Sequence, residues 1–466
     1  MSSPAPAHAF SVPFRAMPPR RAPAGRSTVR LTCLALALMA QTALGAAARP
    51  ATSIAWADYL GAQEQEVRWA HTMRGYGRGR TGMDRLGGMT AKTKSMGPAT
   101  LPGPNVRTLV VPLGSIPRPA DAEGVRAYFR YLDADHGTSW AAFVRKQAET
   151  MAAELKGRQI YWQVGNEINS RNYGNALPGN GAGRWLAAAP NDEAIIPVYA
   201  EKVLAPAVAG LAAANPRPKI IVGTLANAFR PASREWLVKL LDYTVQGSTV
   251  ASLRGRKVSS LGDVVGIHYL LSQDDQDWRS ELDRYYSAVV VDRHMQGLWL
   301  TEEIGAKFAN RGLGGAVALK DWARFMSWVS LRGLTPDQAR MNFWGWQQGP
   351  EGSRGAEAME YLHRQIGDSS VVVMGSREFT PQPFGELFAF KVAGTGNVLL
   401  IAVGTTGTGA RGAVALPAGS PAKGAECHLF GLGGNRPASC AVSAEGLRSD
   451  ALVALRRDDV FVALVK

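Results

Sequence analysis

Two glutamates in similar sequence surroundings are the residues whose chemistry the chain suggests first. Glu167 closes the run Trp162-Gln-Val-Gly-Asn-Glu167, and Glu302 closes the run Trp299-Leu-Thr-Glu302. Two carboxyl groups can hydrolyse a glycosidic bond, because one protonates the leaving oxygen while the other attacks the sugar or activates water. Taken singly, each could be an ordinary loop acid. As a pair in matched positions, they favour glycoside hydrolysis.

The elements that must position these carboxyl groups follow from an alternation of apolar runs and amphipathic segments. Strands are predicted at 107–113, 159–164, 219–224, 263–268, 298–301 and 341–344, and helices at 139–155, 195–214, 234–243, 280–295, 317–332 and 355–366. Short, continuously apolar strands joined by helices are typical of buried parallel strands. Two less regular strands before residue 107, inferred from the count alone, would complete a (β/α)8 TIM barrel. A doubly wound sheet is the alternative, but it normally has a Gly-rich phosphate turn, and none is convincing here.

In such a barrel, catalytic side chains lie where strands end and the following loops begin. By position, Glu167 ends the fourth strand and Glu302 ends the seventh. Glu303 follows directly, and successive side chains of a strand alternate between its two faces. Glu302 and Glu303 therefore cannot both point into the barrel mouth, and the alternation alone does not say which of them does.

The two glutamate motifs resemble those of the glycoside hydrolase clan A barrels. The first motif is most similar to families such as 39, 51 and 79, which also carry a C-terminal β-sandwich. The resemblance implies that Glu167 is the general acid/base and that Asn166 hydrogen-bonds the sugar 2-hydroxyl. It also implies that Glu302, rather than Glu303, is the nucleophile of a retaining mechanism.

The resemblance extends to the expected sugar site. His268 and Tyr269, at the end of the sixth strand, match the His and Tyr positions of the clan, where the Tyr often contacts the nucleophile. Trp344 or Trp346 on the eighth strand matches the Trp that forms the floor of the sugar site. Considered alone, a His near a core strand is more often structural. The mechanism requires no cofactor, and the seven His have no metal-ligand spacing, so we expect no metal.

The two ends of the chain have different compositions. Residues 1–48 carry five Arg and no acid before a short apolar run and several small residues, which predicts a signal peptide and a secreted or periplasmic protein without a stable membrane span. An uncleaved N-terminal anchor is the alternative. Residues 49–368 are predicted to form the barrel, and residues 369–466, with short β runs between Gly and Pro, an all-β sandwich-like domain. Cys427 and Cys440 could form a disulfide there after export.

The charge of the chain limits the classes of partner. The net charge is +14, and 47 basic against 38 acidic residues remain without the predicted signal peptide. Eight basic residues and two acids between 66 and 107 predict either a solvated loop or a basic rim that holds an acidic glycan.

The glutamate motifs and the predicted signal peptide together lead us to expect an exported retaining glycoside hydrolase acting on a polysaccharide or oligosaccharide. A catalytically silent polysaccharide-binding protein is the alternative, and export disfavours nucleic acid as a partner.

Overall fold

The computed structural model describes residues 51–63, 83–85, 108–113, 138–154, 157–175, 177, 186, 188–248, 250–271, 277–303, 313–343, 349–374, 385–404, 413–421, 423–432, 434–444 and 446–466. The chain divides into two compact units, Met1–Arg49 and Pro50–Lys466, and every described residue belongs to the second. The predicted signal peptide, most of the basic segment before residue 107, and both Trp344 and Trp346 lie outside the described residues.

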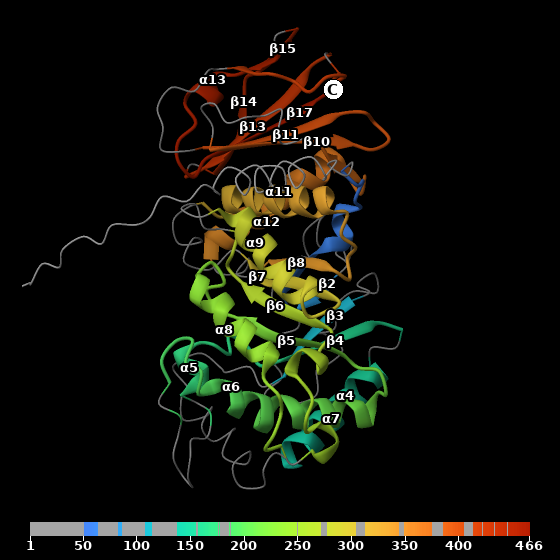
Figure 1. The fold of residues 1–466 in the computed structure, drawn as a ribbon. Coiled ribbons are helices and arrows are strands. Elements are labelled where there is room, and N and C mark those ends of the chain that lie inside the picture. The colour runs from blue at the N-terminus through green and yellow to red at the C-terminus, as the bar shows by residue number, and fades with distance from the viewer. Residues whose placement is uncertain are drawn as a thin grey trace, which may run out of the picture. The chain divides into compact units, whose positions relative to one another are not determined.

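Eight parallel strands close into a barrel in chain order (Figure 1). They are β1 (Leu60–Gln63), β2 (Met83–Arg85), β3 (Thr108–Leu113), β4 (Gln159–Val164), β5 (Lys219–Leu225), β6 (Val264–His268), β7 (Gly297–Glu303) and β8 (Ala339–Phe343). Strands β3 to β8 coincide with the six that the apolar runs predict. The barrel closes because β1 pairs with β8, Leu60 lying opposite Met341. The fold is therefore α/β and TIM-barrel-like, and the doubly wound alternative is wrong.

Each strand from β3 to β8 is followed by helical structure. The main helices are α4 (Thr138–Glu154), α7 (Ala205–Ala214), α8 (Pro231–Asp242), α9 (Trp278–Tyr286), α11 (Gly314–Arg332) and α12 (Gly349–Ile366), with the short α5 (Arg171–Gly174) and α6 (Ile195–Val198) after β4. The continuous helical run Ile195–Ala214 is long and apolar enough to cross a membrane, yet 67% of its most apolar window is buried inside the protein. This burial is what a core helix of the barrel requires.

The barrel interior is filled by a layer of side chains from five strands. Val110, Tyr161, Ile221, Val264 and Trp299 form this cluster, and the Tyr161 and Trp299 rings lie 4.3 Å apart. Every residue of β6 and of β7 is buried. Strands covered on both faces read as continuous apolar runs, which explains why the sequence predicted them as parallel.

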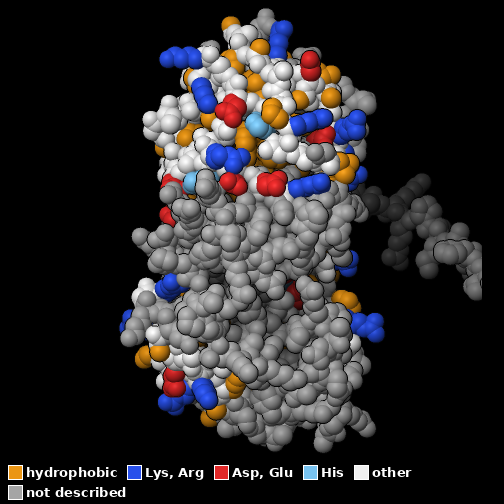
Figure 2. Space-filling view, turned by 180° about the vertical axis from the view of Figure 1, so that it is seen from behind, with side chains coloured by type: hydrophobic (Ala, Val, Ile, Leu, Met, Phe, Trp, Pro, Cys, Tyr) orange, Lys and Arg blue, Asp and Glu red, His pale blue; other side chains and the backbone are white. Residues whose placement is uncertain are grey.

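The described residues of the C-terminal part form two antiparallel sheets and the short helix α13 (Asp450–Val453). The larger has the order β14-β13-β17-β11-β10-β9 and the smaller the order β12-β16-β15. Their bounds are β9 Val371–Val373, β10 Glu386–Val392, β11 Val398–Val403, β12 Ala413–Val414, β13 Ala425–Gly431, β14 Gly434–Ala438, β15 Ala441–Ser443, β16 Gly446–Arg448 and β17 Val460–Val465. Val414 and Leu447 of the smaller sheet share one hydrophobic cluster with Leu400 and Phe461 of the larger, as in a sandwich. On the face seen in Figure 2, side chains of both charges and hydrophobic ones are interspersed over this part.

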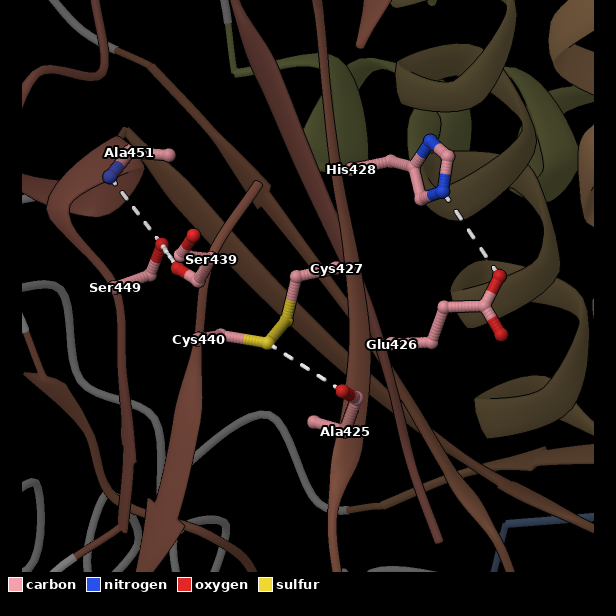
Figure 3. The surroundings of a disulfide bond; sticks show 8 residues. All are labelled: Ala425, Glu426, Cys427, His428, Ser439, Cys440, Ser449 and Ala451. Carbon is pink, nitrogen blue, oxygen red and sulfur yellow. Dashed lines mark hydrogen bonds and ion pairs between the residues drawn. A yellow bond between two sulfur atoms is a disulfide. The ribbon is translucent and has the colours of Figure 1, made fainter. Parts of the chain in front are cut away.

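A disulfide joins Cys427 to Cys440 (Figure 3), which confirms the predicted pairing. Cys427 lies on β13, and Cys440 lies between β14 and β15. The bond therefore links the larger sheet to the segment that enters the smaller one.

Helix α11 lies between the barrel strands and the larger sheet (Figure 1). All residues from Gly314 to Ser330 are buried, since one side of the helix covers the barrel and the other contacts the sheet. Trp322 packs edge-on against Phe390 of β10, with ring centroids 5.1 Å apart. The barrel and the larger sheet thus share one continuous hydrophobic core through this helix.

Candidate active site

Glu167 lies in a tight turn that begins where β4 ends. Gly165 has a φ of 80° and Glu167 a φ of 51°, so two of the three residues after β4 adopt the left-handed conformation. The turn is held from inside the barrel, because Gln163 donates from Nε2 to Gly165 O and to Asn166 Oδ1, both at 3.0 Å. Thr224 of β5 donates to the same Gly165 carbonyl at 3.1 Å. These contacts fix the direction in which the Glu167 side chain leaves the backbone.

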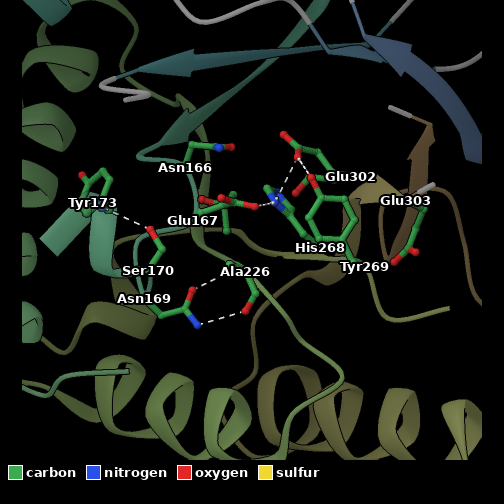
Figure 4. Close-up of polar contacts among 12 residues, drawn as sticks. Asn166, Glu167, Asn169, Ser170, Tyr173, Ala226, His268, Tyr269, Glu302 and Glu303 are labelled. Atoms are coloured by element: carbon green, nitrogen blue, oxygen red, sulfur yellow. Dashed lines mark hydrogen bonds and ion pairs between the residues drawn. The ribbon is translucent and has the colours of Figure 1, made fainter. Parts of the chain in front are cut away.

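A second support comes from Asn169, two residues further along. Its side-chain amide forms a reciprocal pair with the backbone of Ala226, accepting from Ala226 N at 2.7 Å and donating to Ala226 O at 3.1 Å. Asn169 also donates to Asn191 Oδ1 at 2.7 Å. This buried amide ties the loop after β4 to the loop after β5, so Glu167 is held on both sides (Figure 4).

His268 lies between the two predicted catalytic carboxyl groups (Figure 4). Its Nδ1 is 3.4 Å from Glu167 Oε1 and 3.4 Å from Glu302 Oε2. Tyr269, the next residue, donates from its hydroxyl to Glu302 Oε2 at 2.7 Å. The Glu302 side chain is 7% exposed and that of Glu167 is 33% exposed. Glu302 is thus the more buried carboxyl of the pair and accepts from Tyr269, and Glu167 is the one more open to solvent.

Glu302 reaches this position because β7 is irregular. Trp299 belongs to the layer that fills the barrel, so strict alternation would turn Glu303 inward and Glu302 outward. The register between β7 and its neighbours shifts, however: the β6 pairing is offset between Ile267 and His268, and the β8 pairing between Leu300 and Glu303. A β-bulge of this kind reverses the faces of the residues that follow it. It sets Glu302 beside His268.

Glu303 points away from that centre. It is fully buried and accepts hydrogen bonds from the backbone amides of Leu270 at 2.8 Å and Leu271 at 3.3 Å. Burial, and after it the nearby carboxyl of Asp321 on α11, raises the pKa of Glu303 well above its usual range. A carboxyl group enclosed in this way is not available to a substrate.

The centre also has the donor atoms of a small cation site. One oxygen of Glu167, one nitrogen of His268 and one oxygen of Glu302 lie within 4.8 Å of one another. Imidazole and carboxylate are ligands that divalent transition metals accept. The two-carboxylate reaction itself needs no metal.

The structure brings five of the seven predicted site residues together around His268: Asn166, Glu167, His268, Tyr269 and Glu302. The other two, Trp344 and Trp346, lie outside the described residues.

Three supporting residues were not predicted: Gln163, Asn169 and Thr224. Asn169 belongs to the same run as Asn166 and Glu167, and a polar residue so close to a candidate acid was the available signal.

The sequence matches no protein family model and no curated protein. Solved structures of similar fold include a β-porphyranase of glycoside hydrolase family 86 from Bacteroides plebeius, with a TM-score of 0.50, 11% identity, and coverage of 89% of this chain and 75% of that one. A family 51 α-L-arabinofuranosidase from Bifidobacterium longum has a TM-score of 0.46 at 11% identity, covering 91% and 98% of the two chains. A family 39 β-xylosidase from Caulobacter crescentus has a TM-score of 0.44 at 12% identity, covering 90% and 98%. In fold, this chain is similar to the clan A type of glycoside hydrolase barrel.

Proposed function

We propose that this protein is a retaining glycoside hydrolase that cleaves a polysaccharide or oligosaccharide with Glu167 and Glu302. The observation that carries the proposal is the spacing of these residues, because a carboxylate oxygen of each lies within 4.8 Å of the other. Carboxyl groups of retaining enzymes are about 5–5.5 Å apart, whereas inverting enzymes leave about 6.5–9.5 Å for a water molecule. The nearest oxygens of the two carboxyl groups lie within 4.8 Å, which supports the retaining arrangement over the inverting one.

The surroundings of the two carboxyl groups support different roles for them. Glu302 is buried and accepts a short hydrogen bond from the Tyr269 hydroxyl, and such a bond favours the ionised form that can attack the anomeric carbon. Glu167 lies at the more exposed position, where it can reach the leaving oxygen. Asn166 in the same turn is the residue that the resemblance assigns to the sugar 2-hydroxyl.

The reaction then proceeds in two displacements. Glu167 gives its proton to the glycosidic oxygen while a Glu302 oxygen attacks the anomeric carbon, so the C–O bond of the substrate breaks and a glycosyl ester forms. Water next attacks the anomeric carbon, Glu167 takes the proton from that water, and Glu302 leaves as a carboxylate. His268 Nδ1, 3.4 Å from each carboxyl group, can hydrogen-bond to one of them at a time during the exchange of the proton.

The substrate and the compartment remain expectations from the sequence. The basic residues between 66 and 107 favour an acidic glycan, and the composition of residues 1–48 favours export to a secreted or periplasmic location. The proposal therefore includes an acidic glycan as the substrate and a secreted or periplasmic location.

A nucleophile variant tests the mechanism. The purified protein is screened against neutral and acidic polysaccharides and activated aryl glycosides, and the anomer of the first product is read by NMR. E302A should abolish turnover of the aryl glycoside, and azide should restore part of it as a glycosyl azide of inverted anomer, because azide fits the space that the carboxylate leaves. E303A should gain nothing from azide, because Glu303 points away from the pair and its removal opens no space at the anomeric carbon.

Two results would overturn the proposal. A first product of inverted configuration excludes the double displacement. Binding of glycans without turnover of any of them would instead support the silent polysaccharide-binding protein.

A further inference from the structure

Tyr269 adopts a backbone conformation that its surroundings must maintain. Its φ is 58°, in the left-handed region that few residues other than glycine adopt. Its amide donates to Glu302 O at 2.9 Å, and its hydroxyl donates to Glu302 Oε2 at 2.7 Å. A residue held in such a conformation persists only where neighbouring contacts determine it.

Glu303 supplies the first of those contacts. Its two carboxylate oxygens accept from the amides of Leu270 and Leu271, the residues that follow Tyr269. Leu270 and Leu271 are buried, as is Glu303. Two consecutive residues of β7 therefore act on Tyr269. Glu302 contacts its side chain (Figure 4) and its amide. Glu303 holds the backbone that follows it.

The second contact comes from α11 and reaches the larger β-sheet. Arg324 donates from Nη1 to the carbonyl of Leu271, and from Nε to Glu386 Oε2 at 2.6 Å. The indole of Trp278, the first residue of α9, donates to the other oxygen of Glu386. Glu386 is the first residue of β10, so a carboxylate of the C-terminal sheet fixes the arginine that holds the end of the Tyr269 segment.

The charges of this region make the arrangement interdependent. Arg324 is 4% exposed, and a guanidinium so buried needs charged partners. Besides Glu386, Arg324 faces Glu303. Burial and the Asp321 carboxyl raise the pKa of Glu303, and the charge of Arg324 lowers it by a smaller amount. Removing the negative charge of Glu386 should therefore displace Arg324 and with it the carbonyl of Leu271.

We propose that Glu303, Arg324 and Glu386 are positioning residues that hold Tyr269 against Glu302. Because Glu386 belongs to the C-terminal sheet, the position of Tyr269 in the barrel then depends on that sheet. The effect on catalysis rests on the proposed function. The effect on the backbone at Leu270 and Leu271 does not, and it can be measured without a substrate.

E386Q tests the proposal, because it keeps the size of the side chain and removes its charge. The matched control is E426Q: Glu426 of β13 also joins the sheet to the barrel, accepting from Gln365 of α12 at 2.7 Å, but has no contact in the chain of bonds leading to Tyr269. Amide exchange, followed by mass spectrometry on a peptide that includes Leu270 and Leu271, should become faster in E386Q and stay as in the wild type in E426Q.

On an aryl glycoside that the wild type hydrolyses, E386Q should lower kcat about tenfold, because a shift of about 1 Å in a catalytic group can cost about 10²-fold and the shift transmitted from Glu386 should be smaller. KM should change by less than about twofold, since Glu386 contacts no sugar position. Among the described residues, Tyr269, His268 and Glu167 face Glu302, and of these three contacts E386Q should weaken the one to Tyr269. The acidic limb of the pH profile of kcat/KM should therefore move to higher pH.

R324K separates positioning from stability, because lysine keeps the charge opposite Glu386 but cannot serve both Glu386 and the Leu271 carbonyl as the guanidinium fork does. R324K should reproduce the faster exchange and the lower kcat. Wild-type exchange at these two amides in E386Q and R324K would overturn the proposal, even if both variants melt at lower temperature. If the wild type hydrolyses no glycoside, the proposed function fails, while the exchange measurement still decides whether Glu386 holds this segment.

Discussion

Replacing Gly165 with alanine should damage the turn that carries Glu167. A Cβ at this position would lie 2.5 Å from Ile168 Cγ2, 3.1 Å from the Tyr173 hydroxyl and 3.3 Å from the Tyr199 ring, at a φ of 80°. The left-handed conformation costs an L-residue about 1–2 kcal/mol. Forcing an extra carbon into a packed core costs about 1–3 kcal/mol more. We therefore expect G165A to lose about 2–5 kcal/mol of unfolding free energy.

G165A should lose more kcat/KM than the loss of folded protein alone accounts for. Glu167 is two residues from the added carbon, and Ile168, whose Cγ2 the carbon would meet, directly follows Glu167. We therefore expect relief of the clash to shift Glu167. A shift of about 1 Å in a catalytic group can cost 10²-fold, so kcat/KM should fall about 100-fold under conditions where the variant remains folded. Urea unfolding measures the stability, and turnover of an aryl glycoside measures the activity.

Gly157 offers a matched control. Its φ is 78°, close to that of Gly165, but a Cβ there would have nothing within 4 Å, and it lies before β4 rather than after it. G157A should lose only the conformational part, about 1–2 kcal/mol, and keep its activity. Equal stability loss in the two variants, together with wild-type kcat/KM in G165A, would refute the view that packing at Gly165 sets the position of Glu167.

Two further predictions concern Tyr269 and the disulfide. Y269F removes a hydrogen bond to a carboxylate, worth about 1.5–3 kcal/mol, so kcat/KM should fall about 10- to 100-fold and its acidic limb should move to higher pH; an unchanged pH profile would contradict the contact. The double variant C427S/C440S should lose about 2–3 kcal/mol of unfolding free energy in urea while keeping kcat, because the bond closes a short loop in the C-terminal sheets. Peptide mapping that finds both thiols free in the wild type would contradict the bond itself.

The sequence predicted the buried strands β3 to β8, but it could not locate β1 and β2, which are short. Strands β3 to β7 contain apolar runs because both of their faces are covered, whereas the buried β8 includes Arg340 and Asn342. β2 comprises only Met83–Arg85, with two charged residues among its three, and β1 comprises only Leu60–Gln63. Their place in the barrel depends on pairing with β3 and β8, which are distant in sequence, and no local pattern encodes such pairing.

The sequence also placed the main site residues at the correct strand ends, but it did not predict the hydrogen bonds that support them. Glu167 was found because it follows a predicted strand end of such a barrel, and His268 was found because it matches a His position of the clan that the motifs resemble. The reciprocal amide pair of Asn169 with Ala226 could not be predicted, since it joins two loops 57 residues apart. Long-range polar contacts of this type have no periodic signal.

The pair Glu302 and Glu303 illustrates how a backbone irregularity decides function. With regular alternation from Trp299, Glu303 would face His268 and Glu302 would face α11. The register shift at the end of β7 exchanges the two, and motif similarity alone had selected Glu302. One carboxyl group then lies at the barrel mouth with a hydrogen bond from Tyr269, while its neighbour is enclosed with a raised pKa and holds the two amides that follow the same tyrosine. The same irregularity therefore creates the candidate nucleophile and the contact through which the C-terminal sheet can act on it.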